Sequence, residues 1–200
     1  MAFLDEQIGG PKMVKSVAVY CGSSNGASNI YIEGAKNLGK ELAKRNITLI
    51  YGGSSVGLMG AVADSVLEEG GKAIGVMPSF LDKREISHKS LSELYIVETM
   101  HERKAKMAEL ADGFITLPGG AGTMEEFFEV FTWGQIGLHQ KPIGILNINR
   151  YYDPLIGLLN HMNKEQFLQD KYRSMALVDE EPTGLLNQFE DYEAPSVKTY

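Results

Sequence analysis

The chain has 200 residues, of which 44% are hydrophobic, and it carries a formal net charge of -7. A chain of this length and composition is typical of one globular domain with a substantial core, so we predict a single domain over residues 1–200, with frayed ends at 1–12 and 193–200. The negative charge gives no overall positive field, and we therefore expect neither a nucleic-acid polymer nor a membrane as a partner.

The cellular compartment is indicated by what the chain lacks. Residues 1–12 contain no apolar stretch flanked by basic residues, and no run reaches the ~18 apolar residues of a membrane span. The one cysteine, Cys21, cannot form an internal disulfide and lies in a strand-like run, which favours a packing role. These features predict a cytoplasmic protein.

Short runs rich in β-branched residues alternate along the chain with longer segments of helical period. The predicted strands are Ser16–Tyr20, Ile47–Tyr51, Ala73–Met77, Leu94–Glu98, Gly113–Leu117, Pro142–Ile148 and Met175–Val178. The predicted helices are Ile30–Arg45, Gly57–Glu69, His101–Ala111, Gly122–Ile136, Tyr151–Asn163 and Pro182–Tyr192. This alternation predicts an α/β fold with a Rossmann-like, doubly wound parallel sheet covered by helices on both faces.

The unusual residues of the sequence follow the predicted strands. In a parallel sheet of this kind, ligands bind beyond the carboxyl ends of the strands, where the strand order reverses. Four segments stand at that edge: Gly22–Gly26, Gly52–Gly57, Met100–Lys104 and Pro118–Thr123. We therefore expect these segments to converge on one site.

Three of these segments are rich in glycine. Glycine between a strand and a helix lets the backbone approach a ligand, and the free N–H groups of the following helix then face an anion. The segment Pro118–Thr123 has three glycines and a hydroxyl residue, which favours phosphate binding over a plain tight connection. Ser23, Ser24 and Ser55 suit either a ligand or a helix N-cap.

Two familiar nucleotide-binding motifs do not fit the sequence. A P-loop requires a lysine directly after its last glycine, and none of the glycine segments has one. A dinucleotide fingerprint requires G-x-G-x-x-G after the first strand, whereas this chain has Gly22-x-x-x-Gly26. A mononucleotide is the better candidate ligand.

Glu125 and Glu126 lie in the first turns of the helix that follows the Pro118–Thr123 segment. They would stabilise the helix dipole there, but beside a phosphate site a carboxylate is better explained by contact with hydroxyls or with a developing cation. Breaking an N-glycosidic bond creates such a cation at the sugar. We expect only one of these neighbouring side chains to face the site.

Arg103 and Lys104 begin the helix after the fourth predicted strand, where cations oppose the helix dipole. An anionic ligand or a partner carboxylate explains them better than local helix stability does, although a solvated surface pair is the alternative. His88 and His101 have no metal-ligand spacing with other His or Cys residues, so we expect no metal site.

The segment from Pro118 to Glu126, Pro-Gly-Gly-Ala-Gly-Thr-Met-Glu-Glu, resembles the PGGxGTxxE signature of the LOG (Lonely Guy) family. The segments Tyr20–Ser24, Tyr51–Gly60 and Met100–Lys104 also resemble family segments in the same order. Members of this family are cytokinin riboside 5′-monophosphate phosphoribohydrolases, often mislabelled as lysine decarboxylases.

The resemblance implies hydrolysis of AMP or an N6-substituted AMP to the free base and ribose 5-phosphate, without a cofactor, by a homo-oligomer that we expect to be a dimer. It implies catalytic roles for Arg103 and Glu126. The residues expected to bind substrate are Gly22, Ser23, Ser24, Gly52, Gly53, Ser55, Met100, Lys104, Pro118, Gly119, Gly120, Gly122, Thr123 and Glu125. Ser54 departs from many relatives, which have a third glycine there, and nothing identifies a pyridoxal-phosphate lysine.

Two other functions are compatible with the same residues. A non-catalytic AMP sensor would use the same turns to bind the nucleotide, and a phosphotransferase is disfavoured because the P-loop lysine is missing. The predicted helix is apolar on more than one face over residues 127–136, which indicates either a partner subunit or burial within one monomer.

Overall fold

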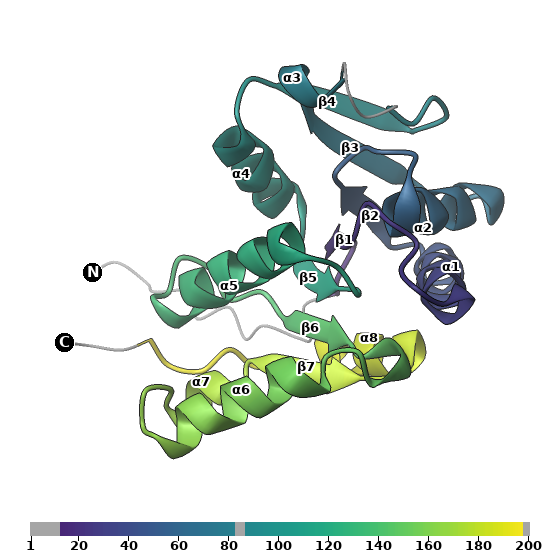
Figure 1. Cartoon of the computed structure of the whole chain (residues 1–200). Coiled ribbons are helices and arrows are strands. Elements are labelled where there is room, and N and C mark those ends of the chain that lie inside the picture. The colour runs from purple at the N-terminus through teal and green to yellow at the C-terminus, as the bar shows by residue number, and fades with distance from the viewer. Residues whose placement is uncertain (1–12, 83–86, 198–200) are drawn as a thin grey trace, which may run out of the picture.

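The computed structural model describes residues 13–82 and 87–197, and their strands form one seven-stranded parallel sheet (Figure 1). The strands are β1 (Ser16–Tyr20), β2 (Thr48–Tyr51), β3 (Ala73–Pro78), β4 (Glu93–Val97), β5 (Gly113–Thr116), β6 (Ile143–Leu146) and β7 (Ala176–Asp179). Their order in the sheet is β4-β3-β2-β1-β5-β6-β7, so the order reverses between β1 and β5. This confirms the predicted Rossmann-like parallel sheet.

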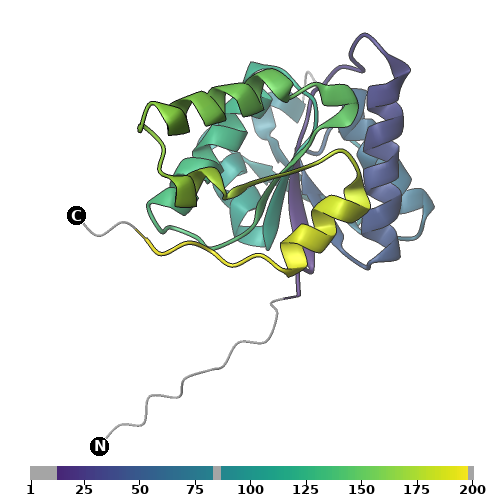
Figure 2. The same cartoon turned by 90° about the horizontal axis from the view of Figure 1, so that it is seen from below.

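Helices cover both faces of the sheet (Figure 2). The longer helices are α1 (Asn29–Lys44), α2 (Gly57–Glu68), α4 (Met100–Leu110), α5 (Ala121–Gln135), α6 (Asp153–Lys164) and α8 (Pro182–Glu190). Buried side chains of α1, α2 and α8 form the core on one face, and those of α4, α5 and α6 form it on the other. Because both faces are covered, central strands such as β5 and β6 are fully buried and read as continuous apolar runs.

The structure adds three short elements, and α6 shows the largest shift of a helix start. The additions are α3 (Ser79–Asp82), a 3-10 turn η1 (Ile148–Arg150) and α7 (Asp170–Arg173). Helix α6 begins at Asp153, not at the predicted Tyr151, because a tight turn with left-handed backbone at Asn149 precedes it. Elements of three or four residues are too short for a helical period to be visible in a sequence.

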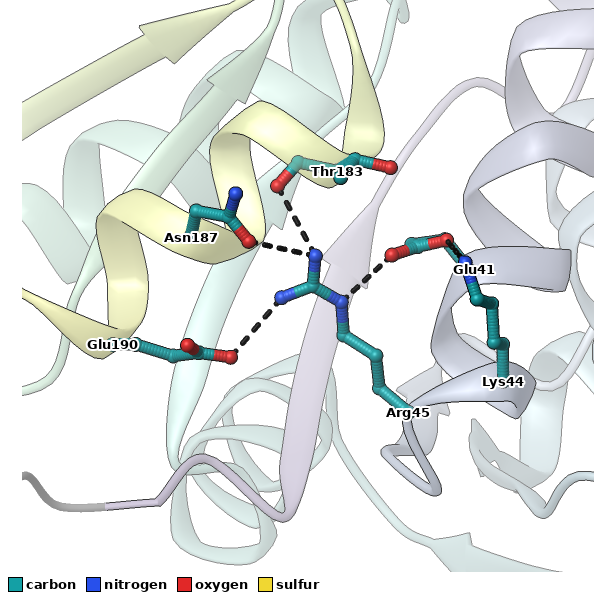
Figure 3. A network of polar contacts seen from close by, with 6 residues as sticks. All are labelled: Glu41, Lys44, Arg45, Thr183, Asn187 and Glu190. Carbon is teal, nitrogen blue, oxygen red and sulfur yellow. Dashed lines mark hydrogen bonds and ion pairs between the residues drawn. The ribbon is translucent and has the colours of Figure 1, made fainter.

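An arginine at the amino edge of the sheet joins the first helix to the last (Figure 3). Arg45 follows α1, and its guanidinium donates to Glu41 at 2.7 Å within the same segment. It also donates to Asn187 at 2.7 Å and to Glu190 at 3.1 Å, both on α8. This network ties the C-terminal helix to the N-terminal half of the chain, away from the carboxyl ends of the strands.

The predicted frayed ends lie partly outside the described residues, which exclude 1–12 and 198–200. Residues 193–197 have no regular secondary structure, and the backbone oxygen of Ser196 accepts a hydrogen bond from Lys171 at 2.9 Å. Within residues 13–82 and 87–197, none of the helices is long and apolar enough to cross a membrane.

Candidate active site

A cavity of about 230 Å³ opens at the carboxyl edge of the sheet, beside the β1–β5 reversal. The residues that line it come from the ends of β1 and β2 and from α2, α4 and α5. They are Val19, Tyr20, Cys21, Gly22, Ser23, Gly52, Met59, Met100, Arg103, Met107, Gly120, Gly122, Thr123, Glu125 and Glu126. The four segments expected at this edge therefore each contribute to one cavity.

The three glycine turns are bonded to one another. The N–H of Gly22 donates to the Pro118 oxygen at 3.0 Å, and the Gly22 oxygen accepts from the N–H of Leu58 at 3.1 Å. Gly57 has a φ of +62°, and a Cβ at that position would collide with the backbone of Ser23. The close approach of the first and second turns thus requires glycine at position 57.

The third glycine turn leads into α5 and is built to leave backbone donors free. Gly120 is the N-cap residue of α5 and caps it with no side chain, and the helix begins at Ala121. Gly120 and Gly122 are exposed at the mouth of the cavity, while Thr123 is buried against it. The N–H groups of a helix's first turn have no partner within the helix, so this end of α5 is suited to an anion.

Arg103 is buried in the first turn of α4, and backbone carbonyls hold its guanidinium. It donates from Nε to the oxygen of Val76 at 3.1 Å and from an Nη atom to the oxygen of Gly52 at 3.0 Å. A Cβ at position 52 would overlap the guanidinium, so the glycine there makes room for the arginine. The role of Gly52 in the structure is therefore to let Arg103 approach β2.

Local capping explains why α4 begins where Arg103 is needed. Thr99 is its N-cap, and the Thr99 hydroxyl accepts a hydrogen bond from the N–H of Glu102 at 3.1 Å. The Glu102 carboxylate in turn accepts from the N–H of Glu98 at 2.8 Å. This arrangement differs from a capping box, because Glu102 accepts from the residue before the N-cap and not from the N-cap itself. The two hydrogen bonds fix the first turn from which Arg103 reaches the cavity.

Glu126 lies on α5, is partly buried, and lines the same cavity as Arg103. Burial raises the pKa of Glu126 to about 7, the nearby Arg103 guanidinium opposes the rise, and Glu125 adds to it. At neutral pH this carboxyl is therefore divided between its protonated and ionised forms, a state typical of groups that take part in proton transfer.

Both adjacent glutamates border the cavity, although we expected only one of them to face the site. They differ in exposure: Glu126 is partly buried, whereas the Glu125 side chain is 63% exposed. Neighbouring side chains on a helix project about 100° apart, but two glutamate side chains are long enough for both to border one cavity. Of the two carboxyl groups, the one shielded from solvent is that of Glu126.

Lys104 is buried but does not line the cavity, so its predicted contact with substrate has no support from its position. Its ammonium donates to Glu125 at 2.9 Å and to Glu129 at 3.1 Å, both on α5. Burial lowers the pKa of Lys104, but these two carboxylates outweigh that effect and raise it. A partner carboxylate is one of the explanations expected for this cation, and the structure contains two such partners.

The other predicted substrate-binding residues divide into two groups. Gly22, Ser23, Gly52, Met100, Gly120, Gly122 and Thr123 line the cavity, whereas Ser24, Gly53, Ser55, Pro118 and Gly119 lie in the same turns without lining it. Ser54 is buried, and its hydroxyl accepts a hydrogen bond from the N–H of Val56 at 3.3 Å. The hydroxyl of Ser54 therefore supports its own turn and does not line the cavity.

Five lining residues were not predicted: Val19, Tyr20, Cys21, Met59 and Met107. Met107 could have been found, since it follows Arg103 by one helical turn and so shares its face of α4. The others are apolar or aromatic residues that sequence alone assigns to the core. Together these five residues form an apolar surface of the cavity beside its polar groups.

Comparison with named proteins shows relatives that share nearly half of the aligned residues over most of this chain. A family model described as a possible lysine decarboxylase matches residues 59–189. A cytokinin riboside 5′-monophosphate phosphoribohydrolase of Rhodococcoides fascians is 46% identical and covers 86% of this chain and 87% of its own. One from Arabidopsis thaliana is 45% identical and covers 90% of this chain and 82% of its own. The chain belongs to the LOG family.

Solved structures share the fold at lower identity. A molybdenum cofactor binding protein from Rippkaea orientalis superposes with a TM-score of 0.68 at 19% identity, covering 90% of this chain and 98% of its own. The molybdenum cofactor carrier protein of Chlamydomonas reinhardtii gives the same TM-score and the same coverages at 16% identity. At these identities the likeness concerns the fold alone.

The decarboxylase description raises the question of pyridoxal phosphate. That cofactor requires a lysine able to form a Schiff base and an acid beside the pyridinium nitrogen. Among the described residues that line the cavity there is no lysine, and the ammonium of the neighbouring Lys104 is paired with two carboxylates. The residues of this site do not fit pyridoxal phosphate.

Proposed function

We propose that this protein hydrolyses the N-glycosidic bond of AMP or an N6-substituted AMP, such as a cytokinin riboside 5′-monophosphate, to the free base and ribose 5-phosphate. The observation that carries the proposal is a partly buried carboxyl, Glu126, and a buried guanidinium, Arg103, which line one cavity beside the free N-terminus of α5. Relatives at 45% and 46% identity are named for this reaction on cytokinin riboside 5′-monophosphates.

The 5′-phosphate is assigned to the Gly119–Thr123 turn. Backbone N–H groups at the start of α5, the helix dipole and the Thr123 hydroxyl all favour an anion there. The turns after β1 and β2 then receive the nucleoside, with Gly22, Ser23 and Gly52 on the cavity wall. This placement directs the anomeric carbon toward the deeper part of the cavity, where the two charged groups lie.

The reaction breaks the bond between C1′ and the base nitrogen, and the bonding electrons leave with the base. The sugar gains oxocarbenium character, which an ionised Glu126 stabilises while it orients the attacking water. Arg103 assists departure by stabilising negative charge on the base. Water supplies a hydroxyl to C1′ and a proton to the base, so the atoms balance without any further reactant.

A product assay tests the proposal directly. Purified protein is incubated with AMP, and adenine and ribose 5-phosphate are quantified by chromatography. We expect equimolar release, and we expect Glu126→Gln to lower kcat by at least about a hundredfold while the fold and AMP binding persist. Unchanged turnover in Glu126→Gln would remove this residue from the mechanism. AMP binding without adenine release by the unmutated protein would instead identify a non-catalytic sensor.

Selectivity for the base is tested by a panel of nucleoside 5′-monophosphates with and without N6 substituents. The unpredicted apolar wall, which includes Met59 and Met107, suits an adenine ring or a hydrophobic N6 group. A higher kcat/KM for N6-isopentenyl-AMP than for AMP identifies a cytokinin-type substrate. The reverse ranking identifies AMP.

We further infer that the protein acts as a homodimer in the cytoplasm. The support for assembly is α5, on which Phe127 and Phe131 are buried against the sheet while Met124 and Phe128 remain only partly covered by their own monomer. A second apolar face on a helix favours a partner subunit. Sedimentation velocity at micromolar concentration should give a dimer, and a monomer there contradicts the inference.

A further inference from the structure

Two tyrosine hydroxyls contact the backbone that joins β5 to α5, a segment that includes the turn proposed above to bind phosphate. Tyr152 donates to the oxygen of Leu117 at 2.6 Å, and Tyr151 donates to the oxygen of Gly119 at 2.7 Å. Neither tyrosine lines the cavity. Both carbonyls belong to the segment that joins β5 to α5, so each hydroxyl fixes the direction of a peptide group in the turn.

The carbonyl oxygens of Pro118 and Gly120 in the same segment also accept hydrogen bonds. The Pro118 oxygen accepts from the N–H of Gly22 at 3.0 Å, and the Gly120 oxygen accepts from the N–H of Met124 at 3.1 Å. Four consecutive carbonyls from residue 117 to residue 120 thus have a donor each. A carbonyl that turned toward the cavity would place a partial negative charge beside an anion, so holding these four oxygens favours phosphate binding.

The segment that presents the tyrosines has an unusual backbone. Asn149 and Arg150 both have left-handed conformations, with φ values of +51° and +58°. Asn147 is buried, and its side-chain oxygen accepts from the N–H of Tyr152 at 2.7 Å. Two successive non-glycine residues in this region cost conformational energy, and such positions persist where the surrounding structure imposes them. Here the turn delays the start of α6 and directs both tyrosines toward β5.

We propose that Tyr151 and Tyr152 are positioning residues for phosphate recognition, which set the orientation of the Leu117–Gly120 backbone so that the start of α5 receives the substrate's 5′-phosphate. This inference rests on the proposed function and extends it to residues that do not touch the substrate. It predicts a loss in the recognition of phosphate and no change in the chemistry performed by Arg103 and Glu126.

Tyr151 is the better residue to change. Tyr151 is 41% exposed, and its ring packs edge to face with Tyr31 and Tyr152, at centroid distances of 5.7 and 4.9 Å. Tyr151→Phe keeps both ring contacts and removes only the hydroxyl that donates to Gly119. Tyr152 is buried, and Tyr152→Phe serves as the second variant because it removes the other hydroxyl.

The test measures binding and turnover separately. In Tyr151→Phe we expect KM for AMP and the inhibition constant of ribose 5-phosphate to rise about fivefold, as for one lost hydrogen bond, with kcat changed by less than about twofold. The inhibition constant of adenine, which has no phosphate, should stay unchanged. The control is Tyr172→Phe, which removes a buried hydroxyl with no hydrogen-bond partner among the described residues and should alter none of these constants.

The outcomes separate this inference from the proposed function. Unchanged ribose 5-phosphate inhibition in both Tyr151→Phe and Tyr152→Phe overturns it, provided that thermal melting shows the variants folded. Equal weakening of adenine and ribose 5-phosphate also overturns it, since the tyrosines would then act on the whole cavity. If the unmutated protein neither releases adenine from AMP nor binds ribose 5-phosphate, the proposed function fails and this inference fails with it.

Discussion

At the scale of single residues, Glu126 is the group whose environment departs most from that of an ordinary carboxylate. Burial raises its pKa to about 7, although the Arg103 guanidinium in the same cavity acts in the opposite direction. A buried acid of this kind weakens the folded state whenever it is ionised, because the unfolded chain hydrates the charge better. The protein therefore retains at this position a group that is unfavourable for stability at neutral pH, which is common at functional sites.

The pH dependence of stability follows from the direction of this shift. The folded state holds the Glu126 proton more tightly than the unfolded state does, so the free energy of unfolding falls as pH rises between about 4.5 and 7. In Glu126→Gln that pH dependence disappears. From pH 4.5 to pH 8 the difference in free energy of unfolding should therefore shift in favour of the variant, by up to about 3 kcal/mol. Urea denaturation of both proteins from pH 4.5 to 8 checks this. A constant difference across that range contradicts the assignment.

At the scale of elements, the ion pairs of Lys104 connect the helix that carries Arg103 to the helix that carries Glu126. Lys104 adjoins Arg103 on α4, and its ammonium contacts Glu125 and Glu129, which flank Glu126 on α5. The Lys104 side chain is only 6% exposed, so solvent screens its charge weakly. The positive charge of Lys104 also lowers the pKa of Glu126. Lys104 thus acts on the site through α5, without contacting the cavity.

Removing this charge should shift the pH profile of the reaction. The proposed chemistry needs the ionised form of Glu126, so kcat/KM should fall below pH about 7. In Lys104→Met the carboxylates of Glu125 and Glu129 lose their partner, and the midpoint of that fall should move up by about 0.5 pH unit or more. Lys104→Arg is the matched control, because it keeps the charge and should keep the profile. Identical profiles for both variants would show that the ion pair has no electrostatic role in the site.

The sequence predicted best the elements that have a clear pattern of apolar residues. The six longer helices and seven strands appear within about two residues of their expected bounds, because amphipathic helices and buried β-branched runs are visible locally. The turn at Asn149 and Arg150 was not predictable, since no glycine marks its left-handed backbone. For the same reason the approach of Tyr151 to Gly119 remained hidden until the structure placed them together.

The site shows the same division between local and tertiary information. The glycine turns, Arg103 and the pair of Glu125 and Glu126 could be noticed because their residue types are unusual for a strand-to-helix connection. The choice of Glu126 over Glu125 came from the resemblance to the LOG family. The partners of Lys104 could not, because α4 and α5 are brought together only by packing on the sheet. The need for glycine at position 52 could not be predicted either, because it depends on a tertiary contact: the Arg103 side chain occupies the space that a Cβ would fill.

At the scale of the whole molecule, the carboxyl edge of the sheet holds the cavity while the amino edge holds the network of Arg45 (Figure 3). The Arg45 side chain is 19% exposed, and besides Glu41, Asn187 and Glu190 it contacts the Thr183 oxygen at 3.3 Å. Helix α8 covers β6 and β7, which lie far along the chain from α1. Arg45 therefore connects α8 to the N-terminal half of the chain, and it does not line the cavity.

A substitution of Arg45 should consequently lower stability without lowering activity. Arg45→Met removes all four contacts, and we expect a loss of about 2 kcal/mol in the free energy of unfolding, because hydrogen bonds to charged groups contribute more than neutral ones. In a protein of this size that corresponds to a melting temperature lower by about 5 °C. The turnover of AMP at 25 °C should stay within about twofold of the unmutated protein, since the network lies at the opposite edge of the sheet from the cavity.

The neighbouring lysine provides the control for this experiment. Lys44 also contacts Glu41, at 3.7 Å, but its side chain is 77% exposed. An exposed ion pair of that kind contributes little, so Lys44→Met should change the free energy of unfolding by less than about 0.5 kcal/mol. If thermal and urea unfolding give equal losses for Arg45→Met and Lys44→Met, the network contributes only surface charge. A larger loss in Arg45→Met alone assigns the stability to the contacts between α1 and α8, because both substitutions remove one positive charge from the same end of the same helix.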